Sequence, residues 1–184
     1  APSFDGEAEW LASAIDHCRA WLAEGVPCAR HRAAIKWLQE QLRVSPASKF
    51  LVFAECREVV DEFAQALEAA TGTTVERFTY CDFLQQEEAM REGADRFQRR
   101  RDRSVLVSDE TGGEGRNFQV ADAVVHLDSS WSIARMEQRV GRLDRLGREP
   151  DRPVRSVYLV GPGAVDQGIA KAHEKVFAVH ERSI

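Results

Sequence analysis

Residues 105–118 read VLVSDETGGEGRNF, an apolar run that passes directly into a glycine-rich turn. The run Val105-Leu106-Val107 has the composition of a buried strand, and an open parallel sheet binds its ligands beyond the carboxyl ends of its strands. Three glycines between positions 112 and 115 let the backbone approach a phosphate closely, and exposed N–H groups there can bind an anion. Taken alone, the stretch is equally compatible with a connecting loop that binds no ligand.

Similar apolar runs lie on both sides of this stretch, at residues 50–53, 75–80, 123–127 and 157–160. Helical spacing of apolar residues predicts a helix that carries Val59 to Leu67 and ends at Thr71-Gly72. Further helices are predicted at about residues 83–100, 133–145 and 165–179. Near-continuous apolar strands that alternate with helices predict an α/β domain, in which helices cover both faces of a parallel sheet.

The first part of the chain is different, because residues 7–43 are helical in pattern throughout, with one break at Gly25-Val26-Pro27. A connector, Ser45-Pro46-Ala47-Ser48, separates this part from the first strand. We therefore divide the chain into a helical extension or linker, residues 1–48, and an α/β domain, residues 49–184. The sequence leaves open whether residues 1–48 pack on this domain or on a neighbouring one.

Composition restricts the class of protein. Of 184 residues, 43% are apolar and 30% are charged, and no run of apolar residues is long enough to span a membrane. The four cysteines form no C-x-x-C pair, which favours reduced thiols in a cytoplasmic protein and predicts no metal site. The first residues include neither a signal peptide nor a starting methionine, which suggests a segment of a longer chain.

Net charge argues against a surface that binds nucleic acid everywhere, because the formal charge is -5. Arginines nevertheless gather at residues 91–103 and 135–152, where a local basic track could form. Each cluster, taken alone, is better explained as a helix face in contact with water.

A second informative stretch, residues 137–148, reads EQRVGRLDRLGR. On a helix that begins after an N-cap at Ser132, the apolar side is formed by Ile133, Met136, Val140 and Leu143. The opposite side presents Gln138, Arg142 and Arg145. Guanidinium groups match phosphate oxygens and stay charged at any working pH, as stabilising a transferring phosphoryl group requires.

Asp109-Glu110 is similar to the acidic pair that holds magnesium in many ATPases. We do not assign that role, because no glycine in the sequence is followed by lysine and a phosphate loop of the G-x-x-x-x-G-K-[ST] type is therefore missing.

Together, the runs GRNFQ at 115–119 and EQRVGRLDR at 137–145 resemble motifs V and VI of the superfamily-two helicases. The spacing, with His126-Leu127-Asp128 and Trp131 between the two runs, is most similar to Snf-type ATPases and to RapA-like bacterial proteins. A looser resemblance covers roughly residues 30–180. It implies a RecA-like C-terminal lobe in which helices cover both faces of a parallel sheet, preceded by an N-terminal helical extension.

The resemblance also implies roles for matching residues. Arg142 and Arg145 would act as arginine fingers on the ATP phosphates, with Gln138 beside them. Gly115 and Asn117 would lie near the nucleotide and the lobe interface. A nucleic-acid track would be formed by Ser108, Thr111 and Gly112.

The family binds ATP and magnesium mainly through a first RecA-like lobe, which this sequence does not contain. The resemblance therefore implies that this chain is inactive alone. Its expected partners are that first lobe and nucleic acid, and double-stranded DNA is the expected kind of nucleic acid. No membrane partner is expected.

Three departures from the family pattern occur: Ser132-Ile133 replaces Asn-Pro, Glu114 takes a position that is often apolar or arginine, and Arg148 takes the place of a glutamine. Two other functions are considered. An RNA helicase lobe is disfavoured, because Gly115-Arg116-Asn117 differs from the R-G-x-D pattern of such proteins. The other is a non-catalytic adaptor that binds nucleic acid or a protein partner.

Overall fold

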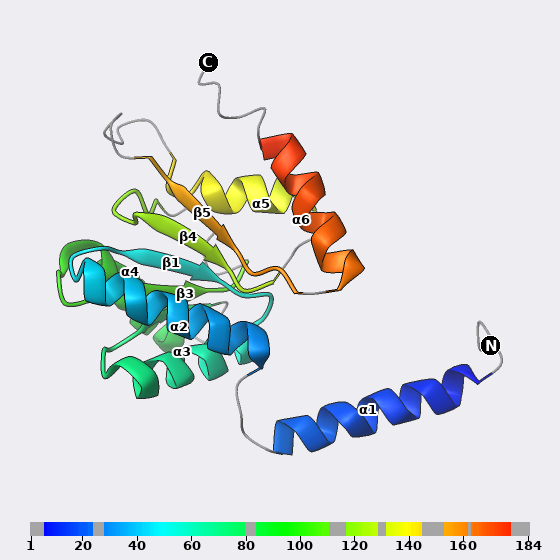
Figure 1. Ribbon diagram of the computed structural model, residues 1–184. Coiled ribbons are helices and arrows are strands. Elements are labelled where there is room, and N and C mark those ends of the chain that lie inside the picture. The colour runs from blue at the N-terminus through cyan, green and yellow to red at the C-terminus, as the bar shows by residue number, and fades with distance from the viewer. Residues whose placement is uncertain are drawn as a thin grey trace.

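The structure is a computed structural model that describes residues 6–23, 28–79, 84–110, 117–128, 132–144, 153–161 and 163–177. Five parallel strands form one sheet in the order β2-β3-β1-β4-β5 (Figure 1). The strands are β1 (Phe50–Phe53), β2 (Glu76–Phe78), β3 (Val105–Ser108), β4 (Ala123–His126) and β5 (Arg155–Tyr158). The helices are α1 (Glu7–Ala23), α2 (Ala29–Val44), α3 (Arg57–Thr71), α4 (Leu84–Arg99), α5 (Ile133–Val140) and α6 (Ala164–Phe177).

The sheet has a hydrophobic core on each face, as the alternating pattern of strands and helices predicted. Side chains that alternate along the strands, such as Val52 and Leu51 in β1, point to opposite faces. One core includes buried residues of α2 and α3, among them Leu38 and Phe63. The other includes Phe97 of α4 and Leu143, which follows α5. The prediction of a RecA-like α/β fold with helices on both faces is confirmed.

Strand β5 differs from its prediction, because it covers Arg155–Tyr158 whereas the apolar run suggested residues 157–160. It pairs with β4 on one side only, at the edge of the sheet. Arg155 and Ser156 are exposed, and Val157 and Tyr158 are only half-buried. In a central strand, which is buried on both faces, the apolar run marks where the strand begins and ends. In this edge strand, which is partly exposed, it does not.

The two N-terminal helices differ in their packing. Helix α2 contributes Ala34, Ile35 and Leu38 to the core that it shares with α3. Helix α1 stands apart from the sheet, and its Trp10 and Ile15 are exposed (Figure 1). The division at residue 48 stays a prediction. The structure shows that α2, which lies within residues 1–48, packs on the sheet of the α/β domain.

The predicted end of α3 at Thr71-Gly72 is confirmed. Gly72 has φ 67°, in the left-handed region that favours glycine, and its amide donates to the Glu68 carbonyl at 2.8 Å. This cap ends the helix shortly before β2 begins.

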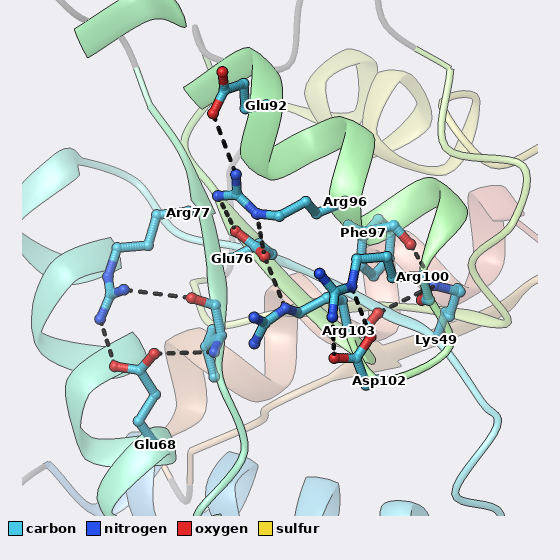
Figure 2. Close-up of polar contacts among 11 residues, drawn as sticks. Lys49, Glu68, Glu76, Arg77, Glu92, Arg96, Phe97, Arg100, Asp102 and Arg103 are labelled. Atoms are coloured by element: carbon cyan, nitrogen blue, oxygen red, sulfur yellow. Dashed lines mark hydrogen bonds and ion pairs between the residues drawn. The ribbon is translucent and has the colours of Figure 1, made fainter. Parts of the chain in front are cut away.

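Polar contacts fix the amino-terminal ends of the strands (Figure 2). The Lys49 ammonium donates to the carbonyls of Phe97 in the last turn of α4 and of Arg100 and Arg103 just after the helix, and burial lowers its pKa. Buried Glu76 accepts from Arg96 at 2.9 Å through both of its oxygens and pairs with Arg103 at 3.2 Å. Several arginines of the 91–103 cluster are thus held in ion pairs.

None of the helices among the described residues is both long and apolar enough to cross a membrane.

Candidate functional site

The carboxyl ends of the three central strands lie side by side. Phe53 of β1 is the register partner of Ser108 in β3 and of His126 in β4. The segments that follow β3 and β4, which carry most of the predicted site residues, therefore emerge at one edge of the sheet. This is the edge at which parallel α/β sheets bind ligands.

The predicted residues of the first stretch have different environments. Ser108 is fully buried, and its hydroxyl donates to the Asp109 carbonyl at 3.0 Å. A contact from Ser108 to a nucleic-acid phosphate would therefore require this side chain to become exposed. Thr111, Gly112 and Gly115 lie outside the described residues.

Asn117, the first described residue after the glycine-rich stretch, is exposed. Its side-chain oxygen accepts from the Gln119 amide at 3.0 Å, and its side-chain nitrogen donates to the Gln119 side chain at 2.9 Å. The Asn117 carbonyl accepts from Gln98 at 3.0 Å. These local bonds hold Asn117 in a defined turn while the residue stays at the surface.

Helix α5 begins as predicted and ends earlier than predicted. Ser132 is its N-cap, and the side chain accepts from the Arg135 amide at 3.4 Å. The prediction that the helix continues to Arg145 is wrong, because α5 ends at Val140 and a turn follows at residues 141–143. The amides of Arg142 and Leu143 bond three residues back, to Arg139 and Val140, so the chain tightens after the helix.

The predicted division of this stretch into a buried apolar side and an accessible polar side is nevertheless largely seen. Met136 and Leu143 are fully buried and Val140 is half-buried, whereas Gln138 is exposed and Arg142 is half-buried. The Ile133 side chain and all of Arg145 lie outside the described residues.

One main-chain hydrogen bond joins the two stretches. The Phe118 amide donates to the Arg142 carbonyl at 2.9 Å. The Phe118 ring is fully buried and packs edge-on against Phe78 and Phe97, with centroids 6.4 and 6.1 Å away. The structure thus brings Asn117 and Arg142, two of the predicted site residues, close to each other.

Arg139 is the functional candidate that sequence reasoning missed. It lies on α5 with 1% of its side chain exposed. Its Nε donates to Glu110 at 2.9 Å, and its Nη1 donates to Asp128 at 2.7 Å. Its guanidinium also lies 5.2 Å from the centroid of the Phe53 ring. One buried cation therefore holds two carboxylates that follow β3 and β4, the strands on either side of β1.

Burial and charge act in opposite directions on Arg139. Burial works to lower the pKa of its guanidinium, but the hydrogen bonds and charges of Asp128 and Glu110 outweigh it and raise the pKa above the ordinary value. The side chain is therefore permanently charged and already fully engaged.

A signal for this role was present in the sequence. At about 100° per residue, Arg139 lies only about 60° from Met136 around the helix, on the apolar side. An arginine at an inward position needs buried carboxylates, and Glu110 and Asp128 follow two predicted strands.

A pocket of about 220 Å³ lies at the same edge of the sheet. It is lined by Cys28, Arg30, His31, Ala54, Glu55, Val59, Leu127 and Asp128. Helix α2 thus reaches the edge at which β1 and β4 end. Among the residues that the structure describes, no cluster of three or more His, Cys, Asp or Glu side chains could hold a metal ion.

Comparisons with known proteins place this geometry among helicases. The family model described as "Helicase conserved C-terminal domain" matches residues 33–147. The RNA polymerase-associated protein RapA of Vibrio vulnificus (strain YJ016) is 34% identical over 137 residues, which are 69% of this chain and 13% of that protein. RapA of Vibrio cholerae (serotype O1, strain M66-2) is 33% identical over 135 residues, 68% of this chain and again 13% of that protein.

Solved structures show the same fold at lower identity. The C-terminal part of the Fun30 ATPase domain has a TM-score of 0.64 and 20% identity, covering 77% of this chain and 44% of that one. The Hef helicase domain of Pyrococcus furiosus has a TM-score of 0.63 and 24% identity, covering 92% of this chain and 35% of that one. Of the two RapA proteins, by contrast, this chain spans only 13% of the length.

Proposed function

This chain belongs to the helicase conserved C-terminal domain family as a RapA-like C-terminal lobe, and from that premise we propose that it is the second lobe of an ATP-dependent translocase stimulated by nucleic acid. Such a lobe closes over ATP held by a first lobe and contributes cationic groups to the phosphates. The observation that carries the proposal is the hydrogen bond from Phe118 to Arg142, because it joins the two motif-bearing stretches.

ATP with its magnesium would supply the transferable phosphoryl group, bound mainly by the first lobe. The residues of this chain fit that task, because Gln138 and Asn117 are exposed and Arg142 is partly accessible. Arg142, with Arg145, would neutralise charge that develops on the phosphoryl oxygens during transfer. Gln138 would orient the phosphate, and Gly115 and Asn117 would border the nucleotide.

Arg139 is unsuited to that role, although it belongs to the same motif. Its guanidinium is buried and donates to Glu110 and Asp128. Glu110 is likewise engaged, so a magnesium ion would have to displace an arginine in order to bind there. We therefore assign the proposed finger role to Arg142 and Arg145 and not to Arg139.

The nucleic-acid track would run along the segment after β3, through Thr111 and Gly112, with double-stranded DNA as the expected ligand. Exposed amides in a glycine-rich turn suit a phosphate backbone. Ser108 would support this segment from inside the sheet, since its hydroxyl is bonded to the Asp109 carbonyl.

The test is the ATPase activity of the full-length protein that carries this lobe, measured without nucleic acid, with duplex DNA and with duplex RNA. We expect duplex DNA to raise turnover more than RNA does. A larger effect of RNA would favour the RNA helicase alternative. Turnover that no nucleic acid alters would refute the proposed stimulation by nucleic acid, and no turnover under any of the three conditions would favour a non-catalytic adaptor.

A further inference from the structure

A cluster of arginines lies at the edge of the sheet that is opposite to the candidate site. Arg103 comes shortly before β3, whose first residue, Val105, pairs in register with Phe50 at the start of β1. The candidate site instead follows the carboxyl ends of the same strands. A ligand of this cluster is therefore separate from a ligand of the candidate site. We call the cluster the arginine patch, and it consists of Arg96, Arg99, Arg100, Arg101 and Arg103.

The exposed part of the arginine patch has more positive than negative charge. Residues 96–103 read RFQRRRDR and contain five arginines against one acidic residue, Asp102. Asp102 pairs with Arg100 at 2.9 Å. Arg99 and Arg101 are exposed, and neither side chain has a hydrogen-bond or ion-pair partner among the residues that the structure describes. Two guanidinium groups at this surface can therefore accept an external anion.

The inner part of the arginine patch is also short of carboxylates (Figure 2). Buried Glu76 of β2 serves two guanidinium groups, since it lies 2.9 Å from Arg96 and 3.2 Å from Arg103. Glu92 lies 3.5 Å from Arg96 and is a longer contact. The inner arginines therefore provide no spare carboxylate that could neutralise the exposed ones.

The backbone of the patch is held in place although its exposed side chains are not. The Lys49 ammonium donates to the Phe97 carbonyl, to the Arg100 carbonyl at 2.7 Å and to the Arg103 carbonyl at 3.1 Å (Figure 2). These three bonds fix the end of α4 and the turn after it to the start of β1. An anion that binds here would order side chains but not the main chain, which lowers the entropic cost of binding.

We propose that the arginine patch is a second nucleic-acid contact, at which Arg99 and Arg101 bind the phosphate backbone of duplex DNA. Guanidinium forks match phosphate oxygens and stay charged at any working pH. Contacts of this kind raise affinity and read no sequence. The inference goes beyond the proposed function, because neither ATP nor the track after β3 takes part in it.

The composition of this surface favours nucleic acid over a folded protein partner. The exposed residues within 96–103 are all charged, and the one apolar residue, Phe97, is fully buried. Specific protein–protein interfaces have a core that is poor in charged residues and includes apolar or aromatic anchors. Interfaces with DNA are more polar and much more positively charged. The arginine patch has the second character.

The experiment compares two double variants of the full-length protein that remove the same charge. Arg99→Gln/Arg101→Gln removes the two unpaired guanidinium groups of the arginine patch. Arg32→Gln/Lys36→Gln is the matched control, because both side chains are exposed on α2, a helix of the core on the other face of the sheet. Substitutions at exposed positions change stability little, so both variants should keep the melting temperature of the wild type.

The first readout is the affinity for a fluorescently labelled DNA duplex, measured by anisotropy without ATP at several salt concentrations. Each phosphate contact contributes about -0.9 to the slope of log affinity against log salt. Arg99→Gln/Arg101→Gln should therefore make the slope shallower by about 1 to 2. It should also weaken the binding of two duplexes of unrelated sequence to the same extent. The control variant should keep the slope of the wild type.

The second readout is ATPase turnover as duplex DNA is titrated. The DNA concentration that gives half-maximal stimulation should rise in Arg99→Gln/Arg101→Gln, whereas turnover at saturating DNA should stay unchanged, because the arginine patch lies away from the candidate site. A fall of turnover at saturating DNA would contradict a contact that is separate from the catalytic site.

Other outcomes would overturn the inference directly. An unchanged salt slope in Arg99→Gln/Arg101→Gln would do so, and an equal change in both double variants would show an effect of net charge only. Labelled polyglutamate tests the protein alternative: if the variant loses polyglutamate binding and keeps DNA binding, the patch fits an acidic polypeptide instead. The slopes are measured without ATP. A wild type whose turnover DNA does not stimulate would therefore refute the proposed function and leave this inference to be decided by the slopes.

Discussion

The main-chain amide of Phe118 and the carbonyl of Arg142 are joined by a 2.9 Å hydrogen bond, although the two residues belong to separate motifs. The bond is anchored on one side by the buried Phe118 ring and on the other by the turn that follows α5. Because both ends are fixed in the core, the relative position of the two motifs depends on how well this aromatic cluster is packed.

Replacing Phe118 with alanine should therefore be costly. The substitution removes a fully buried ring in contact with Phe78 and Phe97, and such truncations destabilise proteins by about 3–5 kcal/mol. Urea denaturation of this chain, followed by far-UV circular dichroism, would measure the free energy of unfolding. Phe118→Leu is the control and should cost clearly less. A loss below about 1 kcal/mol in Phe118→Ala would show that the cluster does not anchor this segment.

His31 should make the stability of the chain depend on pH. It is buried on α2, its Nδ1 lies 3.7 Å from Glu62, and its ring packs edge-on against Phe63 at 5.4 Å. Burial lowers its pKa, Arg30 lowers it further, and the charge of Glu62 opposes both effects. The unfolded chain therefore binds a proton more readily than the folded one. Between the lowered pKa and the ordinary value of 6.5, the stability that a neutral His31 provides is lost as pH falls.

The measurement is the free energy of unfolding at several values between pH 5 and 7.5, for the wild type and for His31→Asn. We expect the wild type to lose more stability than the variant on acidification. Parallel curves for the two proteins would mean that His31 titrates in the folded state as it does in the unfolded one.

The features that the sequence revealed best are those that depend on local periodicity. The three central strands, β3, β1 and β4, and the end of α3 at Gly72 follow from apolar runs and turn chemistry, which act over a few residues. The extent of α5 did not follow, because helical periodicity continues past Val140 through Leu143 whereas the backbone already turns at Gly141. Periodicity reports which residues are buried, and Leu143 is buried without being helical.

The inward position of Arg139 has a signal in the sequence, but its partners could not be read from the order of residues, since they are 29 and 11 positions away. Sequence patterns marked Gln138 and Arg142 as exposed residues. Only the register of β3 with β1 and of β1 with β4 shows that Glu110 and Asp128 emerge close enough to share one guanidinium. The cluster of Arg139, Glu110 and Asp128 therefore depends on the order of the strands in the sheet, which sequence patterns do not predict.

Binding of nucleic acid by this chain alone should be weak and should depend steeply on salt. The net charge is -5, so affinity must come from a small number of local phosphate contacts. Each contact with duplex DNA contributes about -0.9 to the slope of log affinity against log salt. Fluorescence anisotropy titrations at two salt concentrations would give this slope. Nanomolar binding that ignores salt would contradict the proposed track.

The isolated chain should also fail to hydrolyse ATP. It supplies the proposed fingers, whereas the sequence contains no phosphate loop. Phosphate release assays with ATP, magnesium and duplex DNA should show no turnover after rigorous purification. Steady turnover that survives repurification would overturn the proposal that this lobe depends on another one.

The finger residues can be tested apart from stability, because the bond between Phe118 and Arg142 uses main-chain atoms only. Arg142→Ala keeps that bond and removes the guanidinium together with the methylene groups beyond Cβ. Val140 is a suitable control, since it is half-buried in the core next to the same turn.

In the full-length protein, Arg142→Ala and Arg145→Ala should lower ATPase turnover by about 10³- to 10⁵-fold, the contribution of arginine fingers in related phosphoryl transfer. Their melting temperatures should stay close to that of the wild type, since substitutions outside the core change stability by only about 0.5 kcal/mol. Val140→Ala should do the reverse and cost about 0.5–3 kcal/mol of stability while turnover per folded molecule is retained. Arg142→Lys should restore turnover only in part, because an ammonium cannot reproduce the planar fork. Normal turnover in both alanine variants would show that Arg142 and Arg145 are only solvent-exposed side chains without a catalytic role, and would contradict the proposed mechanism.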